Sequence, residues 1–376
     1  MILGILKEPA GERRVALAPD AVAVLLKTGI ETILVEQGAG ENAFFKDADY
    51  ELQGAQAVDQ ATILQKSQVL VAIQPPSADT LRQLQPGQVL IGQFNPLVQH
   101  SLVETLLDAK VTVFSLDLVP RSSRAQAMDV LSSMATVAGY KAVLLAASQL
   151  PTFFPMFMTA AGTVKPAKVL ILGAGVAGLQ AIATAKRLGA VVEAFDVRRA
   201  AKEEVLSLGA KFVEVEGATD DATAGGYAVE QSEDFKKRQA ELIHKHALLA
   251  DVIICTAQIP GRKAPLLLHS ETVAQMKPGA VIVDLAASSG GNAAGSEDGK
   301  MVWTNGVCLI GDSNIPASIP KDASVMFGKN VVNFLKLLAV KGALTLNFED
   351  DIIAASCIAH QGEIVSERLK QVMQTA

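Results

Sequence analysis

KVLILGAGVAGLQAIATAKRLGAVVEAFDVR, residues 168–198, carries the strongest local signal for the fold of this chain. An apolar run (Val169–Leu172) leads directly into glycines spaced G-x-G-x-x-G at Gly173, Gly175 and Gly178. A helical run and a second apolar run follow. A strand, a glycine turn, a helix and a second strand make a βαβ unit, so we expect a parallel sheet with helices on its faces.

Each part of the glycine turn has a physical task in binding a dinucleotide. Gly173 permits the tight turn between strand and helix, Gly175 lets the backbone approach a pyrophosphate, and Gly178 lets the helix pack closely on the strand. The first backbone N–H groups of the helix, at Val176 and Ala177, attract phosphates together with the positive end of the helix dipole. The turn therefore predicts a pyrophosphate site. The alternative is a tight turn in a Rossmann-like domain that binds no nucleotide.

Charged residues after the second strand set the choice of nucleotide. Asp196 ends that strand, where a carboxylate hydrogen-bonds the adenosine ribose hydroxyls of NAD and repels the 2′-phosphate of NADP. Val197, Arg198 and Arg199 follow, and an arginine in this place accommodates a 2′-phosphate. The carboxylate favours NAD(H) as the cofactor, and the two arginines weaken that preference.

The composition excludes several classes of function. Half of the 376 residues are apolar, the formal net charge is −6 and the basic residues form no stripe, so no nucleic-acid partner is expected. The N-terminal apolar run ends at Lys7, which is too early for a signal peptide. Cys255, Cys308 and Cys357 form no CxxC pair, and we expect buried thiols in a reducing compartment. The histidines lack the spacing of a ligand set, so no metal is expected.

Strands and helices alternate along the whole chain. Strands are expected at Ile2–Ile5, Thr32–Val35, Val69–Ile73, Val89–Ile91, Val111–Phe114, Val169–Leu172, Val191–Ala194, Phe212–Val215, Val252–Cys255, Val281–Asp284 and Val307–Ile310. Long helices are expected over about 123–150 and 323–340. The fold class is therefore α/β, with two Rossmann-like domains whose mostly parallel sheets are joined by long helices. Residues 1–132 with 314–376 would form the first domain, and residues 133–313 the NAD(H)-binding Rossmann domain.

One uncharged stretch, Ala142–Val164, is long enough to span a bilayer. Pro151 and Pro155 interrupt it, and proline breaks a helix. We therefore interpret it as the end of a buried helix, a turn and an interdomain segment, with no insertion into a membrane.

Polar side chains gather in a second segment, VPRSSRAQAMDVLSSMATVAGYKAV at residues 119–143. If a helix begins near residue 123, Gln126, Asp129 and Ser132 lie three residues apart and share one face. The neighbouring residues are apolar, and buried polar groups need partners, which the ribose and carboxamide of a bound nicotinamide would supply. The alternative is an N-capped helix with an ordinary solvated face.

This segment resembles one in the alpha subunits of the proton-translocating nicotinamide nucleotide transhydrogenases, where RISRAQSMDALSSMA precedes an AGY helix. The resemblance covers nearly the whole chain and includes KEPAGERRVALAPDAV near the start, AAGTVKPAKVLILGAGVAGLQA, AGGYA at 224–228, TAQIPGRKAP at 256–265 and MKPGAVIVDLAASSGGN at 276–292. It implies a homodimeric NAD(H)-binding subunit that exchanges hydride with NADP(H) on a separate component. It also implies a peripheral place on the cytoplasmic face of the inner membrane, through a membrane-embedded proton channel component.

The resemblance implies a role for each matching residue. Arg121, Gln126, Asp129 and Ser132 would contact the nicotinamide end, with Gln126 and Asp129 as the catalytic residues. Residues 173–178 would hold the pyrophosphate, and Asp196, Val197 and Arg198 would surround the adenosine ribose. Gly226 and Tyr227 would belong to a mobile loop that closes over the site, and Thr256, Ala257 and Gln258 would approach the nucleotide from the end of a later strand. Ser122, Ala127 and Gln258 depart from the usual motif, which affects only fine affinity.

Alanine dehydrogenases also resemble this chain over most of its length and supply the main alternative. They use a lysine, a histidine and an aspartate beside the nicotinamide, and those positions hold Gln74, Asn95 and Ser288 here. Arg14 matches their carboxylate-binding arginine, and a structural role explains it equally well. Hydride exchange between two nicotinamides needs alignment and exclusion of water rather than proton transfer, so the missing groups favour transhydrogenation. A non-catalytic NAD-binding regulator is the third alternative.

Overall fold

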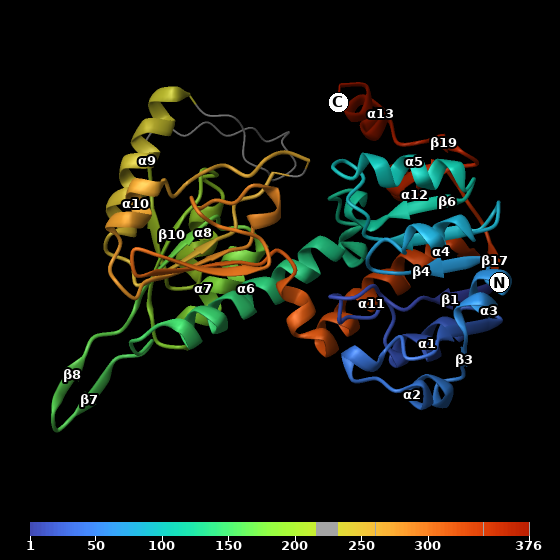
Figure 1. Cartoon of the computed structure of the whole chain (residues 1–376), viewed down its shortest axis with the longest axis horizontal. Helices are drawn as coiled ribbons and strands as arrows, with labels where there is room; N and C mark the ends of the chain where they lie inside the picture. The colour runs from blue at the N-terminus through green and yellow to red at the C-terminus, as the bar shows by residue number, and fades with distance from the viewer. Residues whose placement is uncertain (216–231, 260, 341, 376) are drawn as a thin grey trace. The chain divides into compact units, whose positions relative to one another are not determined.

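A computed structural model describes residues 1–215, 232–259, 261–340 and 342–375, and the chain divides into two compact units (Figure 1). Unit 1 comprises Met1–Met134 and Ala317–Ala376, and unit 2 comprises Ala135–Pro316. The chain leaves unit 1 within one long helix and returns to it just before another. We propose that these two units correspond to the two domains expected from the sequence.

Unit 1 is built on an eight-stranded sheet in the order β19-β18-β6-β5-β4-β1-β2-β3. Its strands are β1 (Ile2–Ile5), β2 (Thr32–Glu36), β3 (Gln56–Val58), β4 (Val69–Val71), β5 (Val89–Gly92), β6 (Thr112–Ser115), β18 (Cys357–His360) and β19 (Glu363–Ile364), beside a small pair of β16 (Ala339–Val340) and β17 (Ala343–Leu344). Its helices are α1 (Pro19–Leu26), α2 (Asp47–Leu52), α3 (Gln60–Lys66), α4 (Ala78–Arg82), α5 (His100–Asp108), α11 (Pro320–Leu338), α12 (Asp351–Ser356) and α13 (Glu367–Thr375). Strands β1 to β6 pair in parallel, whereas β18 and β19 are antiparallel.

Unit 2 is built on a seven-stranded sheet in the order β11-β10-β9-β12-β13-β15-β14. Its strands are β9 (Lys168–Leu172), β10 (Val191–Phe195), β11 (Lys211–Val213), β12 (Val252–Cys255), β13 (Val281–Asp284), β14 (Lys300–Thr304) and β15 (Val307–Gly311). Its helices are α6 (Val130–Gln149), which begins in unit 1, α7 (Val176–Arg187), α8 (Ala201–Ser207), α9 (Glu233–Ala247) and α10 (Ser270–Gln275). All neighbours in this sheet are parallel except β14 and β15.

Both faces of the unit 2 sheet are buried because side chains alternate along each strand. Val169 and Ile171 of β9 pack in one apolar cluster with residues of α6, α7 and α8. Leu170 and Leu172 pack in a second cluster with residues of α9 and α10. The expected α/β fold class, with two mostly parallel Rossmann-like sheets, is confirmed.

The start of α6 differs from the sequence-based expectation. The α-helix begins at Val130 rather than near residue 123, and a short 3-10 helix, η3 (Gln126–Met128), precedes it. The break follows from Asp129, which has an extended backbone (φ −74°, ψ 90°) and whose Oδ1 accepts the Ser132 backbone N–H at 2.9 Å. An aspartate in that place is an N-cap, so Gln126, Asp129 and Ser132 do not share one helix face.

The stretch after α6 also differs from the expectation. The helix ends at Gln149, but the supposed interdomain segment forms an exposed antiparallel hairpin of β7 (Phe157–Thr159) and β8 (Gly162–Val164) within unit 2 (Figure 1). Within the described residues, α6 alone is long and apolar enough to cross a membrane, and 44% of its most apolar window is buried inside the protein. A core helix passes the same test.

Candidate functional site

The glycine turn links β9 to α7 at the carboxyl edge of the unit 2 sheet. Gly173 has φ 101°, which an L side chain rarely adopts. A Cβ at Gly173 would meet Thr256 Oγ1 at 2.6 Å, and one at Gly178 would meet the Gly173 carbonyl oxygen at 1.9 Å. Among the residues that the structure describes, a Cβ at Gly175 would approach Arg198 Nη2 alone, at 4.0 Å. The first and third glycines are therefore required for packing, whereas the second faces open space.

Helix α7 begins directly after Gly175, so the backbone N–H groups of Val176 and Ala177 lie at its first turn. No side chain of the described residues caps this N-terminus. The first four N–H groups of a helix have no partner within the helix. The turn therefore offers donors and a positive dipole end to an anion beside Gly175.

Asp196 connects the end of β10 to this turn. Its Oδ2 accepts the Ala174 backbone N–H at 2.7 Å, and its Oδ1 accepts the Arg198 backbone N–H at 2.9 Å. The Arg198 guanidinium adds two bonds, from Nε to Oδ1 at 2.9 Å and from Nη2 to Oδ2 at 2.7 Å. The carboxylate is thus held in place next to the glycine turn, with Arg198 as its ion-pair partner.

A shallow hollow lies beside Asp196. The apolar side chains that line it are Phe195, Val197, Phe212, Val215 and Phe235, and Glu214 and Arg199 complete its rim. Apolar side chains next to a carboxylate are a surface on which a flat base could pack, with its sugar hydroxyl groups near the carboxylate.

The segment after β12 is fastened to the same edge of the sheet. Thr256 Oγ1 donates to the Gly173 carbonyl oxygen at 2.8 Å, and Gln258 Nε2 donates to the Leu285 carbonyl oxygen at 2.7 Å. Ala257 is held on both sides by Asn292, whose Oδ1 accepts the Ala257 N–H at 3.0 Å and whose Nδ2 donates to the Ala257 carbonyl at 2.9 Å. The structure thus brings Thr256, Ala257 and Gln258 to the edge that carries the glycine turn and Asp196.

Two residues that position this edge were not identified from the sequence. Asn292 is fully buried, and Asp284 (1% exposed) accepts the backbone N–H groups of Ala286, Asn292 and Ala293. The sequence contains a signal for Asp284, because this acidic residue directly follows the apolar run Val281–Val283 and precedes a glycine-rich turn. Buried polar groups of this kind hold loops because each must find its partners in the protein.

The polar residues of the second segment lie together in unit 1. Arg121 and Gln126 are exposed, and Asp129 and Ser132 are partly buried. Besides capping α6, Asp129 accepts the Ser132 hydroxyl on Oδ2 at 2.6 Å. Asp129 and Ser132 therefore form the helix cap that the alternative interpretation expects. Gln126 precedes this cap on η3, and its side chain is exposed. Gly226 and Tyr227 lie outside the described residues.

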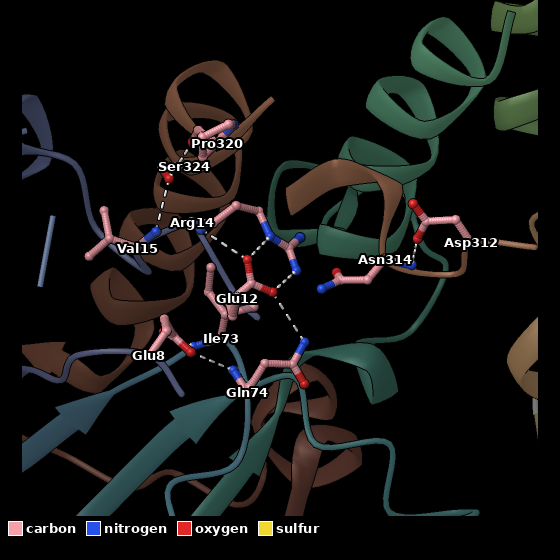
Figure 2. A network of polar contacts seen from close by, with 10 residues as sticks. All are labelled: Glu8, Glu12, Arg14, Val15, Ile73, Gln74, Asp312, Asn314, Pro320 and Ser324. Atoms are coloured by element: carbon pink, nitrogen blue, oxygen red, sulfur yellow. Dashed lines mark hydrogen bonds and ion pairs between the residues drawn. The ribbon is translucent and has the colours of Figure 1, made fainter. Parts of the chain in front are cut away.

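Two of the residues that bear on the alanine dehydrogenase alternative, Arg14 and Gln74, lie in one polar network of unit 1 (Figure 2), whereas Ser288 belongs to unit 2. Arg14 (4% exposed) donates to Glu12 through Nε at 2.8 Å and Nη2 at 2.6 Å, and Gln74 Nε2 lies 3.4 Å from Glu12 Oε2. Burial acts to raise the pKa of Glu12, but the bonds and charge of Arg14 outweigh it and hold that pKa below its usual range. A structural role of Arg14 is therefore evident.

Glu8 occupies the same network and behaves differently. Its carboxylate accepts the backbone N–H groups of Ile73 at 2.6 Å and Gln74 at 2.9 Å (Figure 2). Burial nevertheless raises the pKa of Glu8 to about 8, because burial penalises the charged form more than the two bonds favour it. Among the described residues no group of His, Cys, Asp and Glu is placed to hold a metal ion, and all three cysteines are buried and free.

Comparison with known proteins gives matches over nearly the whole chain. The models of the alanine dehydrogenase/PNT N-terminal and C-terminal domains match residues 4–138 and 142–367. The chain is 46% identical over 370 residues to the first part of NAD(P) transhydrogenase subunit alpha of Rhodospirillum rubrum, covering 96% of each. It is 30% identical to alanine dehydrogenase of Mycobacterium tuberculosis, covering 95% of this chain and 92% of the enzyme. A solved structure of transhydrogenase from Sinorhizobium meliloti matches with a TM-score of 0.86 and 39% identity, covering 98% of this chain and 100% of that one.

Proposed function

Because this chain belongs to the alanine dehydrogenase/PNT family, we propose that it is the NAD(H)-binding subunit of a proton-translocating transhydrogenase, which exchanges hydride with NADP(H) on a partner component. The observation that carries the proposal is the turn at Gly175, with helix N–H groups that no side chain of the described residues caps and with Asp196 beside it. The greater identity to transhydrogenase alpha subunits than to alanine dehydrogenase supports the choice of reaction.

NAD(H) is the nucleotide that fits this site. Its pyrophosphate would lie over Gly175 at the N-terminus of α7, and its adenosine ribose would donate to Asp196, with Val197 and Arg198 alongside. The adenine would lie against the apolar side chains beside Asp196. Thr256, Ala257 and Gln258 would border the nucleotide.

The reaction itself moves one hydride, with both electrons of its C–H bond, from C4 of a reduced nicotinamide to C4 of an oxidised one. No proton is gained or lost at either carbon, so this subunit needs to align the ring and exclude water. Arg121, Gln126, Asp129 and Ser132 would hold the nicotinamide end. The presence of Gln74, Asn95 and Ser288, where an amino-acid dehydrogenase needs acid and base groups, agrees with this division of tasks.

The partners are those that the resemblance to transhydrogenase alpha subunits implies. An NADP(H)-binding component would bring the second nicotinamide, and a membrane-embedded component would couple the transfer to proton movement. This subunit would then lie on the cytoplasmic face of the inner membrane through its partners.

A hydride-transfer assay tests the proposed function. The purified chain is mixed with NADH, the NADP(H)-binding component of a transhydrogenase and NADP⁺, and NADPH formation is followed. We expect transfer only when both proteins are present, and no turnover of this chain with L-alanine and NAD⁺. Robust alanine oxidation, or no transfer with the partner, would reject the proposal.

We expect nucleotide selectivity to depend on Asp196. The isolated chain should bind NADH at least about tenfold more tightly than NADPH, because the carboxylate bonds the ribose hydroxyls and repels a 2′-phosphate. Asp196→Ala should narrow that ratio. The measurement is a fluorescence titration with each nucleotide, with Asp251→Ala, at the opposite end of the sheet, as the control. Equal affinities in the unmodified protein would contradict the role of Asp196.

The homodimer is the last element of the proposal, and the β7–β8 hairpin is the surface that supports it. An isolated two-stranded hairpin is marginally stable in water, yet this one exposes Phe157 (43%) and Met158 (75%), with Phe153 packed on Phe157 at 4.6 Å between ring centroids. An apolar surface of this kind marks a contact site, and we propose that a second copy covers it.

Met158→Lys tests the dimer. We expect the variant to shift toward monomer by at least about tenfold in its dissociation constant, since a charge would be buried in an apolar contact. Met301→Lys, at an exposed methionine of the edge strand β14, is the matched control. Sedimentation at several concentrations decides the matter, and a Met158→Lys protein that remains as dimeric as the control would count against the hairpin.

A further inference from the structure

Side chains of helix α11 hydrogen-bond the backbone of the turn that carries Gln126, and the sequence alone did not identify them as part of the site. Residues Gln126–Met128 form the 3-10 helix η3, which packs on α11. The helical hydrogen-bond ladder stops there because Asp129 is extended. The carbonyl of Ala127, next to Gln126, therefore needs partners from elsewhere in the protein.

Two asparagines of α11 supply those partners. Asn330 Nδ2 donates to the Ala127 carbonyl oxygen at 2.9 Å, and Asn333 Nδ2 donates to the same oxygen at 3.2 Å. The two residues are three apart on the helix and so share a face. Lys336 Nζ donates to Asn333 Oδ1 at 3.2 Å, which keeps the amide of Asn333 turned with its nitrogen toward Ala127. Both acceptor positions of one carbonyl oxygen are thus occupied.

Asn330 is a costly residue if stability is its only role. It is 6% exposed, and its Oδ1 is buried with no hydrogen-bond partner among the described residues. An unsatisfied buried acceptor costs about 1–3 kcal/mol, which an apolar side chain in the same place would avoid. The residue is therefore best explained by what its Nδ2 holds, namely the backbone beside Gln126.

A second anchor holds the other side of the turn. Arg124 donates to Asp350 through Nη1 at 2.7 Å and Nη2 at 2.9 Å, and also contacts Asp351. Asp350 caps α12 by accepting the Ile352 backbone N–H at 2.9 Å. The Arg124 guanidinium lowers the pKa of Asp350 to about 2, so this pair stays charged at neutral pH. Gln126 thus lies between an anchor at Arg124 and an anchor at Ala127.

We propose that Asn330 and Asn333 are positioning residues for hydride transfer, which act by fixing the Ala127 carbonyl and thereby the direction of the Gln126 side chain. The inference rests on the proposed function, because it assigns the Gln126 side chain to the nicotinamide end. Neither asparagine needs to touch the nucleotide. Their loss should lower the rate of transfer rather than the affinity for NADH, since phosphates and adenosine would dominate binding.

The first test is single-turnover transfer in the presence of the NADP(H)-binding component. We expect Asn330→Ala/Asn333→Ala to slow transfer by roughly tenfold, the order expected for mispositioning, with NADH affinity within about threefold. Lys329→Ala, at an exposed residue of the same helix, is the matched control and should transfer at the unmodified rate. Where Asn330→Ala impairs folding, Asn333→Ala alone carries the test.

A double-mutant cycle with Gln126→Asn separates positioning from general damage. If the asparagines act through Gln126, the variant that combines all three changes should transfer hydride about as slowly as Gln126→Asn alone. Multiplicative losses, or an unchanged rate in the asparagine variants while the unmodified protein is active, would overturn the proposal.

Deuterium exchange gives a readout that does not need transfer. In the isolated chain the asparagine double variant should exchange the backbone amides of residues 125–129 at least about fivefold faster, with the rest of α11 unchanged. If the unmodified protein transfers no hydride, the proposed function is rejected. Deuterium exchange would still show whether the two asparagines fix the backbone of residues 125–129. Unchanged exchange over 125–129 would then refute it.

Discussion

Replacing Gln126 with asparagine should slow hydride transfer by roughly 10- to 100-fold, while NADH affinity stays within a few-fold. The asparagine keeps the amide, which both donates and accepts, but shortens its reach by one methylene. Because the transfer needs the two rings in close contact, a small displacement of one ring acts steeply on the chemical step. The exposed position of Gln126 on η3 means that the change disturbs no buried packing.

The measurement is single-turnover stopped flow at saturating NADH with the partner component. Gln37→Asn, a glutamine change away from this segment, serves as the control for amide shortening. The rate should also lack the bell-shaped pH dependence of a titrating acid and base in this subunit. An unchanged rate in the Gln126→Asn protein would remove Gln126 from the mechanism.

The second large effect concerns alanine substitutions at two glycines of one turn, Gly178 and Gly175. The first should lower stability, and the second should lower nucleotide affinity without lowering stability. In Gly178→Ala the new Cβ would lie 1.9 Å from the Gly173 carbonyl oxygen, which is backbone and cannot swing aside. Overpacking of this kind costs about 1–3 kcal/mol, which for a unit of this size lowers the melting temperature by about 2–12 °C, and we also expect weak NADH binding. The damage is to the packing of α7 on β9.

Gly175→Ala is the matched variant. The nearest atom to its Cβ would be Arg198 Nη2 at 4.0 Å, and Gly175 has φ −78°, which any residue adopts. The protein should therefore melt within about 2 °C of the unmodified one, yet lose at least about tenfold in NADH affinity because the Cβ stands where the pyrophosphate approaches. Thermal unfolding and NADH titration of both variants decide this. Full affinity in Gly175→Ala would place the pyrophosphate elsewhere.

Secondary structure was predictable where neighbouring residues alone specify it. One continuous stretch of sequence encodes β9, the glycine turn, α7 and β10. Each expected strand of unit 2 is present, and its ends lie within two residues of the expected ones. The edge strand β14 was missed, although Asn305 and Gly306 between it and β15 carried the signal. Both have positive φ (50° and 79°), as a tight hairpin turn requires, and Asn-Gly is the pair that most readily adopts it.

The start of α6 shows why the second segment was harder to interpret. Its residues are compatible with a helix from residue 123 onward, and periodicity gave no reason to stop. Asp129 competes for the backbone N–H of Ser132, and that local capping bond makes the helix begin at Val130. A polar residue three positions before a serine is therefore as compatible with an N-cap as with one side of a polar face.

Local sequence is sufficient for the portion of the site that is contiguous along the chain. Gly173, Gly175, Gly178 and Asp196 lie within one βαβ unit, so steric limits on φ, helix dipole and strand length specify their arrangement without help from the rest of the protein. The long-range bonds depend on the tertiary structure. Asn292 reaches Ala257 across 35 residues and Asn330 reaches Ala127 across 203, because α11 returns the chain to unit 1. No local pattern encodes such a bond, since its geometry exists only once each unit has packed.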